Sequence, residues 1–578
     1  MLAAHDAGRS RKKMKTVIIM QARSSSSRLP GKAMLPVGGY PSAALAALRA
    51  GNLGLETLVA TSAEPSDDGL ADVLTDVLGK HGIRVVRGPL EDVLARYALA
   101  VNELPEDSVV VRLTGDNVLP DGDLVRELVS AFAGSGMEYL SQDWPQSGLP
   151  FGLGGEAFTV STLRRAQAMA TSSHDREHVT PWIRRNCRMS MHVPQILRGA
   201  DFGHLRCTID DEEDYQRICR LFTGIADPVH ARWFELVKKL SVLPGEPGFR
   251  VPYRVSSGTI RSELTLGTAQ LGMEYGITNR AGQPARPLAI RMARQAIAHG
   301  VTALDTARAY GDAEAVLGEA LTGAWRSRVE VITKLDLPDS LRDDAEESAV
   351  RAAVDASVRR SCEALRVEKL STLLLHRSHH YRAWGGAVWR RLLEMRHEGT
   401  NHEGTIGTLG ASVYEPQEAL ELLEDPAIRH LQIPMNVLDW RWKVNGVDRA
   451  LADRPDVVVH ARSALLQGLL ASGAHASWPV SGEYDASSCL RRLRELAAEF
   501  GRESLTDLCL AYVRSQAWIT SVVVGCETLE QLNENLRLFC LPKLTAAQCA
   551  ELESSLPRAP ESLLNPSQWK LVHERSAG

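Results

Sequence analysis

The sequence lacks the features of a disulfide-stabilised or membrane-spanning protein. Its nine cysteines are scattered along 578 residues, with an odd total and no Cys-x-x-Cys pair, which argues against a disulfide framework and a zinc site. No apolar run approaches the length of about 18 residues that a membrane span needs. We therefore expect a cytoplasmic protein. Residues 1–13 are expected to be a disordered leader, because no apolar stretch follows the basic residues there.

The sequence also lacks an excess of either charge. It has 66 Lys and Arg residues against 71 Asp and Glu residues, so the net charge is −5 and no nucleic-acid footprint is expected. Apolar residues make up 44 %, enough for a sizeable core. A chain of 578 residues is too long to fold around a single hydrophobic core. Because one barrel can take up about 250 residues, two large domains are the simplest interpretation.

A segment rich in proline, glycine and serine marks the expected domain boundary. Residues 241–262 have this composition, which is typical of a linker. We therefore expect domains over 14–245 and 263–556, a linker over 246–262 and a tail over 557–578.

Short apolar runs alternate with amphipathic segments in both domains, which predicts an α/β protein whose mostly parallel sheets are covered by helices. In the first domain the runs lie at residues 16–21, 56–62, 83–88 and 108–115. The second domain has eight runs, the number in a (β/α)8 barrel. They lie at residues 264–270, 303–307, 329–335, 371–376, 406–412, 430–436, 457–465 and 521–526.

A basic, serine-rich loop follows the first expected strand. Residues 20–39 place Arg23, Arg28 and Lys32 beside four consecutive serines and Gly31. Cations and small residues at the carboxyl edge of a parallel sheet suit a triphosphate. Taken alone, such a stretch is more often a flexible surface loop. The Gly-x-x-x-x-Gly-Lys-Ser/Thr motif of nucleoside-triphosphate hydrolases is missing.

Polar residues end three successive strands of the expected barrel, where barrel enzymes place catalytic groups. They are Asp305, Lys334 and His376, with Tyr310 in the loop after the second strand. An ammonium group near a phenol lowers its pKa from about 10, so Lys334, paired with Asp305, would make Tyr310 a usable acid. His376 would donate a hydrogen bond to a substrate oxygen. Each residue alone would more often be a solvated or salt-bridged strand end.

The first domain resembles the sugar-activating cytidylyltransferases, in particular the spore coat polysaccharide biosynthesis and acylneuraminate types. The motifs QARSSSSRLPGK, LVATSAEPSDDGLAD, VVRLTGDNVLPD and LRCTIDDEEDY occur in the family's order. The resemblance implies a Rossmann-like nucleotidyltransferase sheet of the glycosyltransferase-A type, with CTP and a sugar as substrates. It assigns CTP to Arg23, Arg28, Lys32 and Asp116, Mg²⁺ to Asp116 and Asp210, and the sugar side to Glu156, Glu177 and His178.

Two departures from the family pattern concern the first domain. Ser25 stands at a loop position usually held by glycine, and Gly154 stands where an acidic residue is expected, two residues before Glu156. The second departure puts the choice of sugar in doubt. Alternative roles remain open: Asp116 would more often be a cap or turn residue, and the sugar-side residues could form a buried Glu–His contact.

The second domain resembles the aldo-keto reductases, through LGTAQLG, DTARAYGDAEAVLG, LGASVYEP and VVVGCETLEQLNENL. The resemblance implies hydride transfer between a nicotinamide dinucleotide and a carbonyl, with Asp305, Tyr310, Lys334 and His376 as catalytic residues. The residues that it implies around the dinucleotide are Ser412, Gln432, Ser463, Leu465, Gly468, Gly525, Gln531 and Asn535. Between Gly525 and Gln531 no cation is present for the 2′-phosphate of NADP, and Glu527 would repel it, so we lean slightly towards NAD, with weak selectivity as the alternative.

Together these features predict a bifunctional enzyme that builds an activated acidic or amino sugar for a surface glycan. One alternative keeps only the barrel as an active oxidoreductase and makes the first domain a nucleotide-sugar binding module. A weaker alternative makes the whole chain a scaffold. The sequence identifies neither sugar nor the direction of the redox step, and it leaves a homodimer open.

Overall fold

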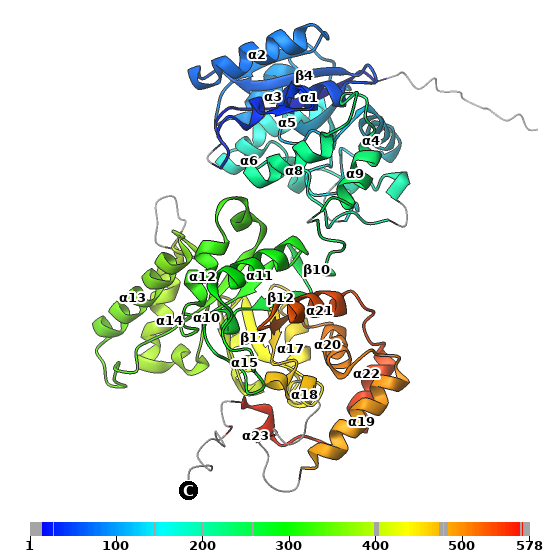
Figure 1. Cartoon of the computed structure of the whole chain (residues 1–578). Coiled ribbons are helices and arrows are strands. Elements are labelled where there is room, and N and C mark those ends of the chain that lie inside the picture. Colours follow the sequence, from blue (N-terminus) through cyan, green and yellow to red (C-terminus); the bar gives the residue numbers. More distant parts are fainter. Residues whose placement is uncertain are drawn as a thin grey trace, which may run out of the picture. The chain divides into compact units, whose positions relative to one another are not determined.

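The chain forms two compact units in the computed structural model, Met1–Phe249 and Arg250–Gly578 (Figure 1). The structure describes residues 14–26, 28–142, 146–197, 200–244, 246–256, 259–397, 404–472, 478, 484–566 and 569. The leader expected over 1–13 therefore lies outside the described residues. Within the described ranges no helix is both long and apolar enough to cross a bilayer. All nine cysteines are free thiols in the structure.

A seven-stranded mixed sheet forms the centre of the first unit, in the order β5-β4-β1-β6-β8-β7-β9. The four strands expected from apolar runs are confirmed and pair in parallel, whereas β8 runs antiparallel to β6 and β7. The strands of the sheet are β1 (Thr16–Gln21), β4 (Glu56–Ser62), β5 (Arg84–Gly88), β6 (Val109–Thr114), β7 (Tyr139–Ser141), β8 (Glu156–Thr159) and β9 (Met189–Met191). A separate ribbon pairs β2 (Pro36–Val37) with β3 (Tyr40–Pro41).

Helices cover both faces of this sheet. Ile18 and Met20 face one hydrophobic core, while Val17 and Ile19 face the other. Burial on both sides explains why β1 reads as an uninterrupted apolar run. The helices are α1 (Ser42–Ala50), α2 (Asp68–Gly79), α3 (Val93–Ala100), α4 (Gly122–Ser135), α5 (Val160–Met169), α6 (Ser173–His178), α7 (Pro181–Asn186), α8 (Glu212–Phe222) and α9 (Trp233–Ser241).

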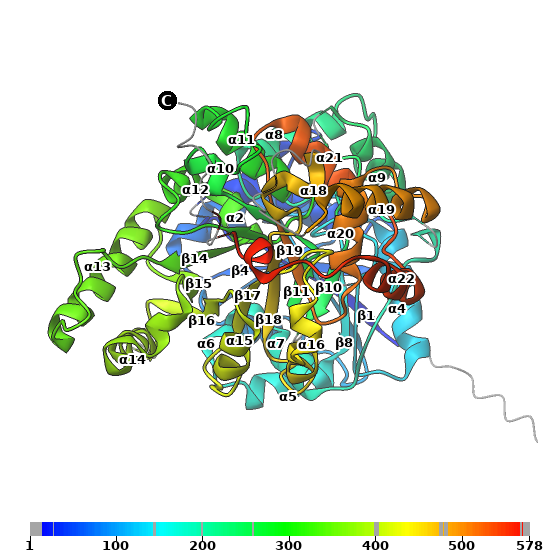
Figure 2. The ribbon, with the colours of Figure 1, turned by 90° about the horizontal axis from the view of Figure 1, so that it is seen from below.

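Eight parallel strands close into a barrel in the second unit, and this confirms the expected (β/α)8 fold. Figure 2 shows β14 to β18 side by side, with α13 and α14 outside them. The strands are β12 (Leu264–Gly267), β13 (Ala303–Asp305), β14 (Glu330–Leu335), β15 (Leu370–Leu375), β16 (Ile406–Ser412), β17 (His430–Pro434), β18 (Val458–Arg462) and β19 (Ser521–Gly525).

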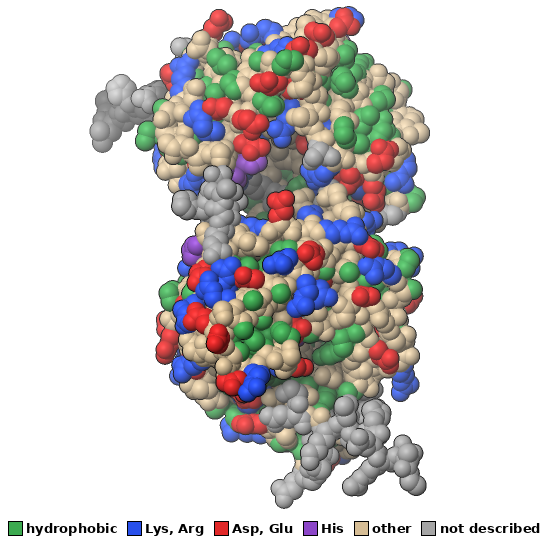
Figure 3. All heavy atoms as spheres, turned by 90° about the vertical axis from the view of Figure 1, so that its left-hand side faces the viewer, with side chains coloured by type: hydrophobic (Ala, Val, Ile, Leu, Met, Phe, Trp, Pro, Cys, Tyr) green, Lys and Arg blue, Asp and Glu red, His purple; other side chains and the backbone are tan. Residues whose placement is uncertain are grey.

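The barrel helices lie between and beyond these strands. They are α10 (Ala269–Gly272), α11 (Arg286–Ala298), α12 (Ala313–Ala320), α13 (Glu347–Leu365), α14 (Ala383–His397), α15 (Pro416–Leu423), α16 (Arg441–Val444), α17 (Val447–Ala452), α18 (Leu469–Ser472), α19 (Ala486–Glu499), α20 (Leu505–Ser515), α21 (Leu529–Phe539), α22 (Ala546–Ser555) and α23 (Glu561–Leu564). On the face shown in Figure 3, cationic and anionic side chains are interspersed.

The segment expected as a linker, residues 246–262, is largely ordered and contains a hairpin. The boundary between the units falls after Phe249, and β10 (Tyr253–Ser256) pairs with β11 (Thr259–Ser262) as an antiparallel hairpin. Arg254 Nη1 donates to the Gln516 carbonyl at 3.3 Å, ahead of β19. Arg261 Nη1 lies 2.6 Å from Glu330 Oε2 at the start of β14. These contacts tie the hairpin to the amino ends of barrel strands.

The first part of the expected tail also belongs to the barrel unit. Leu563 and Leu564 of α23 are fully buried. Trp440 Nε1 donates to the Ala559 carbonyl at 3.1 Å, and Asn565 Nδ2 donates to Glu415 Oε1 at 3.4 Å. Burial of apolar side chains therefore docks residues 559–565 onto the loops that follow β16 and β17.

Two neighbouring histidines are buried inside the barrel. His430 and His460 are each 1 % exposed, and their ring centroids lie 4.4 Å apart. Burial, together with the charges of Arg261 and Lys334, lowers the pKa of His430 to about 3. Burial and the neighbouring His430 likewise hold the pKa of His460 well below its ordinary value. Both rings are therefore neutral at pH 7.

Mild acid should destabilise the barrel through this pair. The unfolded chain takes up protons below pH 6.5 while the buried rings stay neutral, so stability falls as the pH drops, by about 1.4 kcal/mol per pH unit for each histidine. Thermal unfolding of His430→Leu should lose less stability between pH 7 and 5 than the wild type. The exposed His397→Leu serves as control and should keep the wild-type slope. An unchanged slope in His430→Leu would contradict the assignment.

Candidate functional site

In the first unit, the loop after β1 brings cations to the two aspartates expected to hold a metal. Lys32 Nζ lies 3.2 Å from Asp116 Oδ2 and 3.0 Å from Asp210 Oδ1. Arg28 Nη2 lies 3.1 Å from the same Asp210 oxygen. Gly31, at φ +69°, turns the chain directly before Lys32, a backbone conformation that favours glycine. Four of the expected nucleotide-site residues therefore meet at one edge of the sheet.

Asp116 and Asp210 fit a divalent cation. Burial would raise the pKa of Asp210, but the charges of Lys32 and Arg206 outweigh burial and keep that pKa below its ordinary value. Asp116 Oδ1 is buried, and no described group donates a hydrogen bond to it. A buried carboxylate oxygen without a partner is costly. Mg²⁺ would satisfy it, because this ion is often held by one or two carboxylates together with substrate phosphates.

Arg23 and Glu177 lie close together, which links the loop to the expected sugar side. Arg23 Nη2 is 4.0 Å from Glu177 Oε1, and both side chains are almost half exposed. His178 is exposed at the end of α6, and its ring packs against that of His174 with centroids 4.6 Å apart. Glu177 therefore contacts the loop at residues 20–39 that is expected to bind the nucleotide, which we call the nucleotide loop.

Glu156 is part of a buried network, which corrects its expected role on the sugar side. Its carboxylate lies 2.6 Å from Arg112 Nη1 and 2.6 Å from Arg184 Nη2. Tyr139 and Thr180 donate further hydrogen bonds to Oε1 at 2.6 and 3.0 Å. Burial alone would raise the pKa of Glu156, but the two arginines lower it to about 2. The alternative of a buried structural contact is nearer the structure, with arginines in place of histidine.

Asp67 anchors the nucleotide loop by accepting hydrogen bonds from Ser24, a role that was not predicted from the sequence. Ser24 donates to Asp67 Oδ1 through its backbone N at 2.6 Å and its Oγ at 2.5 Å. Ser62, at the end of β4, donates to the other oxygen of the fully buried Asp67. Burial would raise the pKa of Asp67, but the serine hydrogen bonds outweigh it and keep Asp67 ionised. The LVATSAEPSDDGLAD motif contains this residue and was the available signal.

In the second unit, a cavity of about 620 Å³ opens at the carboxyl ends of the barrel strands. Asp305, Ser412, Arg462 and Gly525 each line it as the last residue of a strand. The cavity wall holds three of the expected catalytic residues, Asp305, Tyr310 and His376. It also holds all eight residues expected around the dinucleotide: Ser412, Gln432, Ser463, Leu465, Gly468, Gly525, Gln531 and Asn535.

Lys334 lies behind this wall as the buried partner of Asp305. The Lys334 ammonium is 2.9 and 2.8 Å from the two Asp305 oxygens, and it donates to the Thr306 carbonyl at 2.8 Å. Gln432 Nε2 also donates to Asp305 Oδ1 at 2.6 Å. The Lys334 side chain is only 1 % exposed, and burial lowers its pKa although Asp305 opposes the shift.

Tyr310 and His376 face each other beside this ion pair. Their ring centroids are 5.8 Å apart, and Lys334 Nζ is 4.9 Å from the centroid of the Tyr310 ring. Burial and the Asp305 charge nevertheless raise the pKa of Tyr310, which corrects the expectation that Lys334 lowers it. The reason is that the Asp305 carboxylate matches the ammonium charge. Burial, with Lys334 and Arg462, lowers the pKa of His376 to about 3, so its ring is neutral.

The loop after β18 adopts a strained backbone where the dinucleotide is expected. Ser463 and Gln467 have φ of +61° and +51°, which side chains other than glycine rarely adopt. At Gly468 a Cβ atom would lie 1.9 Å from Thr278 Oγ1, so only glycine fits there. Residues with a strained backbone of this kind are common at ligand-binding sites. Arg462, Tyr275 and Tyr414 are among the cavity residues that were missed, although Arg462 ends a strand and the strand-end rule applied to it.

The fold and sites together define a nucleotide-binding α/β domain joined to a barrel oxidoreductase. A sequence model of the aldo/keto reductase family matches residues 263–557, and the chain belongs to this family. A sequence model of cytidylyltransferases matches residues 17–226, so the first unit is a cytidylyltransferase domain. The spore coat polysaccharide biosynthesis protein SpsF of Bacillus subtilis is 30 % identical over 241 residues, which cover 39 % of this chain and 95 % of SpsF.

Further relatives match the same two regions. The uncharacterized oxidoreductase YqkF of Bacillus subtilis is 25 % identical over 51 % of this chain and 92 % of its own length. A solved cytidylyltransferase from Leptospira borgpetersenii is 27 % identical, with 39 % and 93 % of the two chains covered and a TM-score of 0.35. The holo form of aldo-keto reductase AKR11C1 from Bacillus halodurans is 21 % identical, with 54 % and 98 % covered and a TM-score of 0.44.

Loss of Asp67 should weaken CTP binding, because Ser24 and the loop that carries the cations expected to bind phosphate lose their anchor. Removing hydrogen bonds to a charged group costs about 1.5–3 kcal/mol, so we expect Asp67→Ala to raise the Kd for CTP roughly 10- to 100-fold in calorimetry. The neighbouring Asp68→Ala is the matched control, since the Asp68 side chain is 58 % exposed and pairs with Arg87 at the surface. Unchanged CTP affinity in a folded Asp67→Ala protein would show that the loop needs no anchor.

Proposed function

We propose that the protein joins CTP-dependent activation of a surface-glycan sugar to a nicotinamide-dependent redox step on a sugar. The observation that carries the proposal is the pairing of two separate sites in one chain. Lys32 links Asp116 and Asp210 in the first unit, and Asp305, Lys334, Tyr310 and His376 gather in the second. The similarity of the first unit to a spore coat polysaccharide biosynthesis protein supports a glycan sugar as its substrate.

In the nucleotide site, the chain supplies the charges that a triphosphate needs. Arg28 and Lys32 form ion pairs with aspartates in the structure. When a triphosphate binds, these two cations would pair with its phosphate oxygens instead. A Mg²⁺ ion held by Asp116 and Asp210 would neutralise phosphate charge and orient the α-phosphorus. A sugar hydroxyl then attacks the α-phosphorus and pyrophosphate leaves. Arg23 and Glu177 lie beside the loop, where they would contact the incoming sugar.

In the barrel, Tyr310 is the general acid of carbonyl reduction. Its raised pKa keeps the phenol protonated at pH 7, ready to give its proton to the carbonyl oxygen. The neutral His376 donates a hydrogen bond to the same oxygen and fixes the carbonyl. When bound, the nicotinamide cofactor supplies the hydride that reaches the carbonyl carbon. The buried Asp305–Lys334 ion pair lies beneath these two residues and fixes the shape of the site. The reverse reaction, oxidation of an alcohol, uses the same groups.

The charge of the cavity favours NAD over NADP. Glu527 and Glu534 line the cavity beside Gln531 and Asn535, where the adenosine is expected. Among the described residues that line it, Arg462 alone is a lysine or arginine, and it lies at the end of β18, away from that region. A 2′-phosphate would therefore meet two carboxylates and no cation.

The free thiols also support our proposal of a cytoplasmic location.

A second candidate function has one observation in its favour. At Gly154, where an acidic residue was expected, a Cβ atom would lie 2.1 Å from the Gln142 carbonyl oxygen. No side chain fits there unless the backbone moves, so the sugar side of the first unit differs from the family pattern. This difference favours a binding module without turnover, with the barrel as the only active site.

Single substitutions should separate the two activities. Asp116→Ala should lower pyrophosphate release from CTP and sugar acids by ~100-fold or more, and it should leave nicotinamide-dependent aldehyde reduction intact. Tyr310→Phe should lower aldehyde reduction by ~100-fold or more and leave pyrophosphate release intact. Each variant is thus the control for the other, with absorbance at 340 nm and a pyrophosphate assay as readouts. CTP binding without any pyrophosphate release in the wild type would favour the second candidate.

Charge reversal at Glu527 should shift the cofactor preference. Glu527→Lys replaces repulsion of the 2′-phosphate by attraction, so we expect the Kd ratio of NADP to NAD to fall by ~10-fold or more. Fluorescence titration with both reduced cofactors measures this ratio. Glu530→Lys is the control, because Glu530 is exposed in α21 and does not line the cavity. A wild-type enzyme that binds NADP more tightly than NAD would refute the lean towards NAD.

A further inference from the structure

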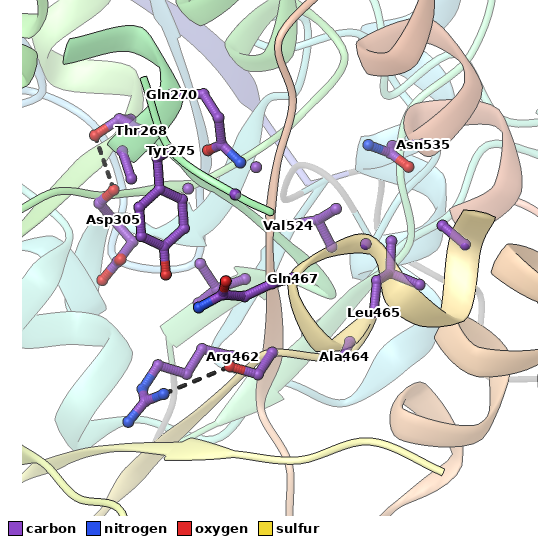
Figure 4. Close-up of a pocket in the computed structure, with 18 of the residues that line it drawn as sticks. Thr268, Gln270, Tyr275, Asp305, Arg462, Ala464, Leu465, Gln467, Val524 and Asn535 are labelled. Atoms are coloured by element: carbon purple, nitrogen blue, oxygen red, sulfur yellow. Dashed lines mark hydrogen bonds between the residues drawn. The ribbon is translucent and has the colours of Figure 1, made fainter. Parts of the chain in front are cut away.

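Arg462 lies at the end of the barrel cavity lined by the expected catalytic residues Asp305, Tyr310 and His376, which we call the reacting end. It ends β18 and lines the cavity, and its guanidinium carbon lies 4.2 Å from the centroid of the Tyr414 ring. Figure 4 shows the guanidinium on the side of Asp305 and Tyr275, and on the opposite side from Asn535. Arg462 therefore faces the space where a substrate would meet the catalytic groups, and not the expected adenosine region.

The positive charge of Arg462 is not matched within the described part of the chain. No described carboxylate forms an ion pair with it; Nη2 donates to the Val413 carbonyl at 3.1 Å and Nη1 contacts Ser463 Oγ at 3.5 Å. A guanidinium has five N–H donors, so several remain for a ligand. The other nearby cation, Lys334, is matched by Asp305. The reacting end thus carries one unmatched positive charge.

We propose that Arg462 binds a carboxylate of the barrel's substrate, which makes this substrate an oxo or hydroxy acid, such as an acidic sugar. The planar guanidinium fork matches a carboxylate in two parallel hydrogen bonds. One cation also balances the single charge of a carboxylate, whereas a phosphate dianion would keep an unmatched charge. The ammonium group of an amino sugar would be repelled.

The opposite charge at the other end of the cavity strengthens this assignment. Glu527 and Glu534 line the end expected to hold adenosine. An anionic substrate is therefore attracted to the Arg462 end and repelled from the other, which orients it before the reaction. The inference rests on the oxidoreductase function proposed above and narrows its substrate from sugars in general to acids.

The test compares succinic semialdehyde with butanal, which have the same chain length and differ in the terminal carboxylate. With the full-length enzyme and NADH we expect kcat/KM to favour succinic semialdehyde. Arg462→Met should lower kcat/KM for succinic semialdehyde by ~30-fold or more and change that for butanal by less than ~3-fold. Arg462→Lys should recover part of the loss, which shows that the effect comes from charge and not from misfolding.

Arg377→Met is the matched control. Arg377 follows His376 at the same end of the barrel, but its side chain is 61 % exposed and it does not line the cavity. Its loss removes one positive charge from the same face, so an unchanged preference for succinic semialdehyde is expected. An equal change in both arginine variants would overturn the proposal in favour of a general surface-charge effect.

Other outcomes overturn the proposal in distinct ways. Equal losses for both aldehydes in Arg462→Met, or a loss confined to NADH binding, would assign Arg462 to the cofactor. A stronger dependence on Arg462 for glyceraldehyde 3-phosphate than for succinic semialdehyde would assign it to phosphate. If the wild type reduces none of these aldehydes, glyceraldehyde 3-phosphate included, the proposed redox function fails. Calorimetry with D-glucuronate and D-glucose on the wild type and Arg462→Met then still decides whether Arg462 binds a carboxylate.

Discussion

The arrangement of the barrel site depends on the ion pair between Lys334 and Asp305. A lysine ammonium that is 1 % exposed is costly unless its charge and its hydrogen bonds are satisfied. Both Asp305 oxygens and the Thr306 carbonyl satisfy it, and Gln432 completes the Asp305 shell. Burial is the largest influence on the pKa values of Tyr310 and His376 beside the pair; the Asp305 charge adds to it at Tyr310, and the Lys334 charge adds to it at His376. Tyr310 stays protonated and His376 stays neutral, as an acid and a neutral hydrogen-bond donor must.

The nucleotide site uses a lysine in a different way. Lys32 lies between Asp116 and Asp210, and its side chain remains 17 % exposed. Arg28 and Arg206 also pair with Asp210, whereas Asp116 Oδ1 has no donor among the described groups. This site is therefore electrostatically incomplete and suited to a ligand that brings a cation and phosphates together. The barrel pair is complete, and the cavity cation without a described carboxylate partner is Arg462, which we propose binds the substrate.

Much of this organisation was predictable from short-range patterns. All eight barrel strands were located within a few residues, because strands buried on both sides read as continuous apolar runs. The strand-end rule then identified Asp305, Lys334 and His376. The short strands β7, β8 and β9 carry no such runs and were missed. The hairpin β10–β11 within the expected linker was not predicted, since the composition there is typical of a linker and the hairpin's order comes from contacts with residues such as Gln516 and Glu330.

The sequence by itself determined the two domains, their order, and the polar residues available at each strand end, because periodicity and motif order are local properties of the chain. The tertiary structure alone decided the charge state and partners of those residues. Glu156 is enclosed by Arg112 and Arg184, Asp67 holds Ser24, and the charge of Lys334 is matched by Asp305 and so does not lower the pKa of Tyr310. Burial and pairing act between residues far apart in sequence, so only the folded chain shows which charges are satisfied and which, like that of Arg462, have no ion-pair partner among the described carboxylates.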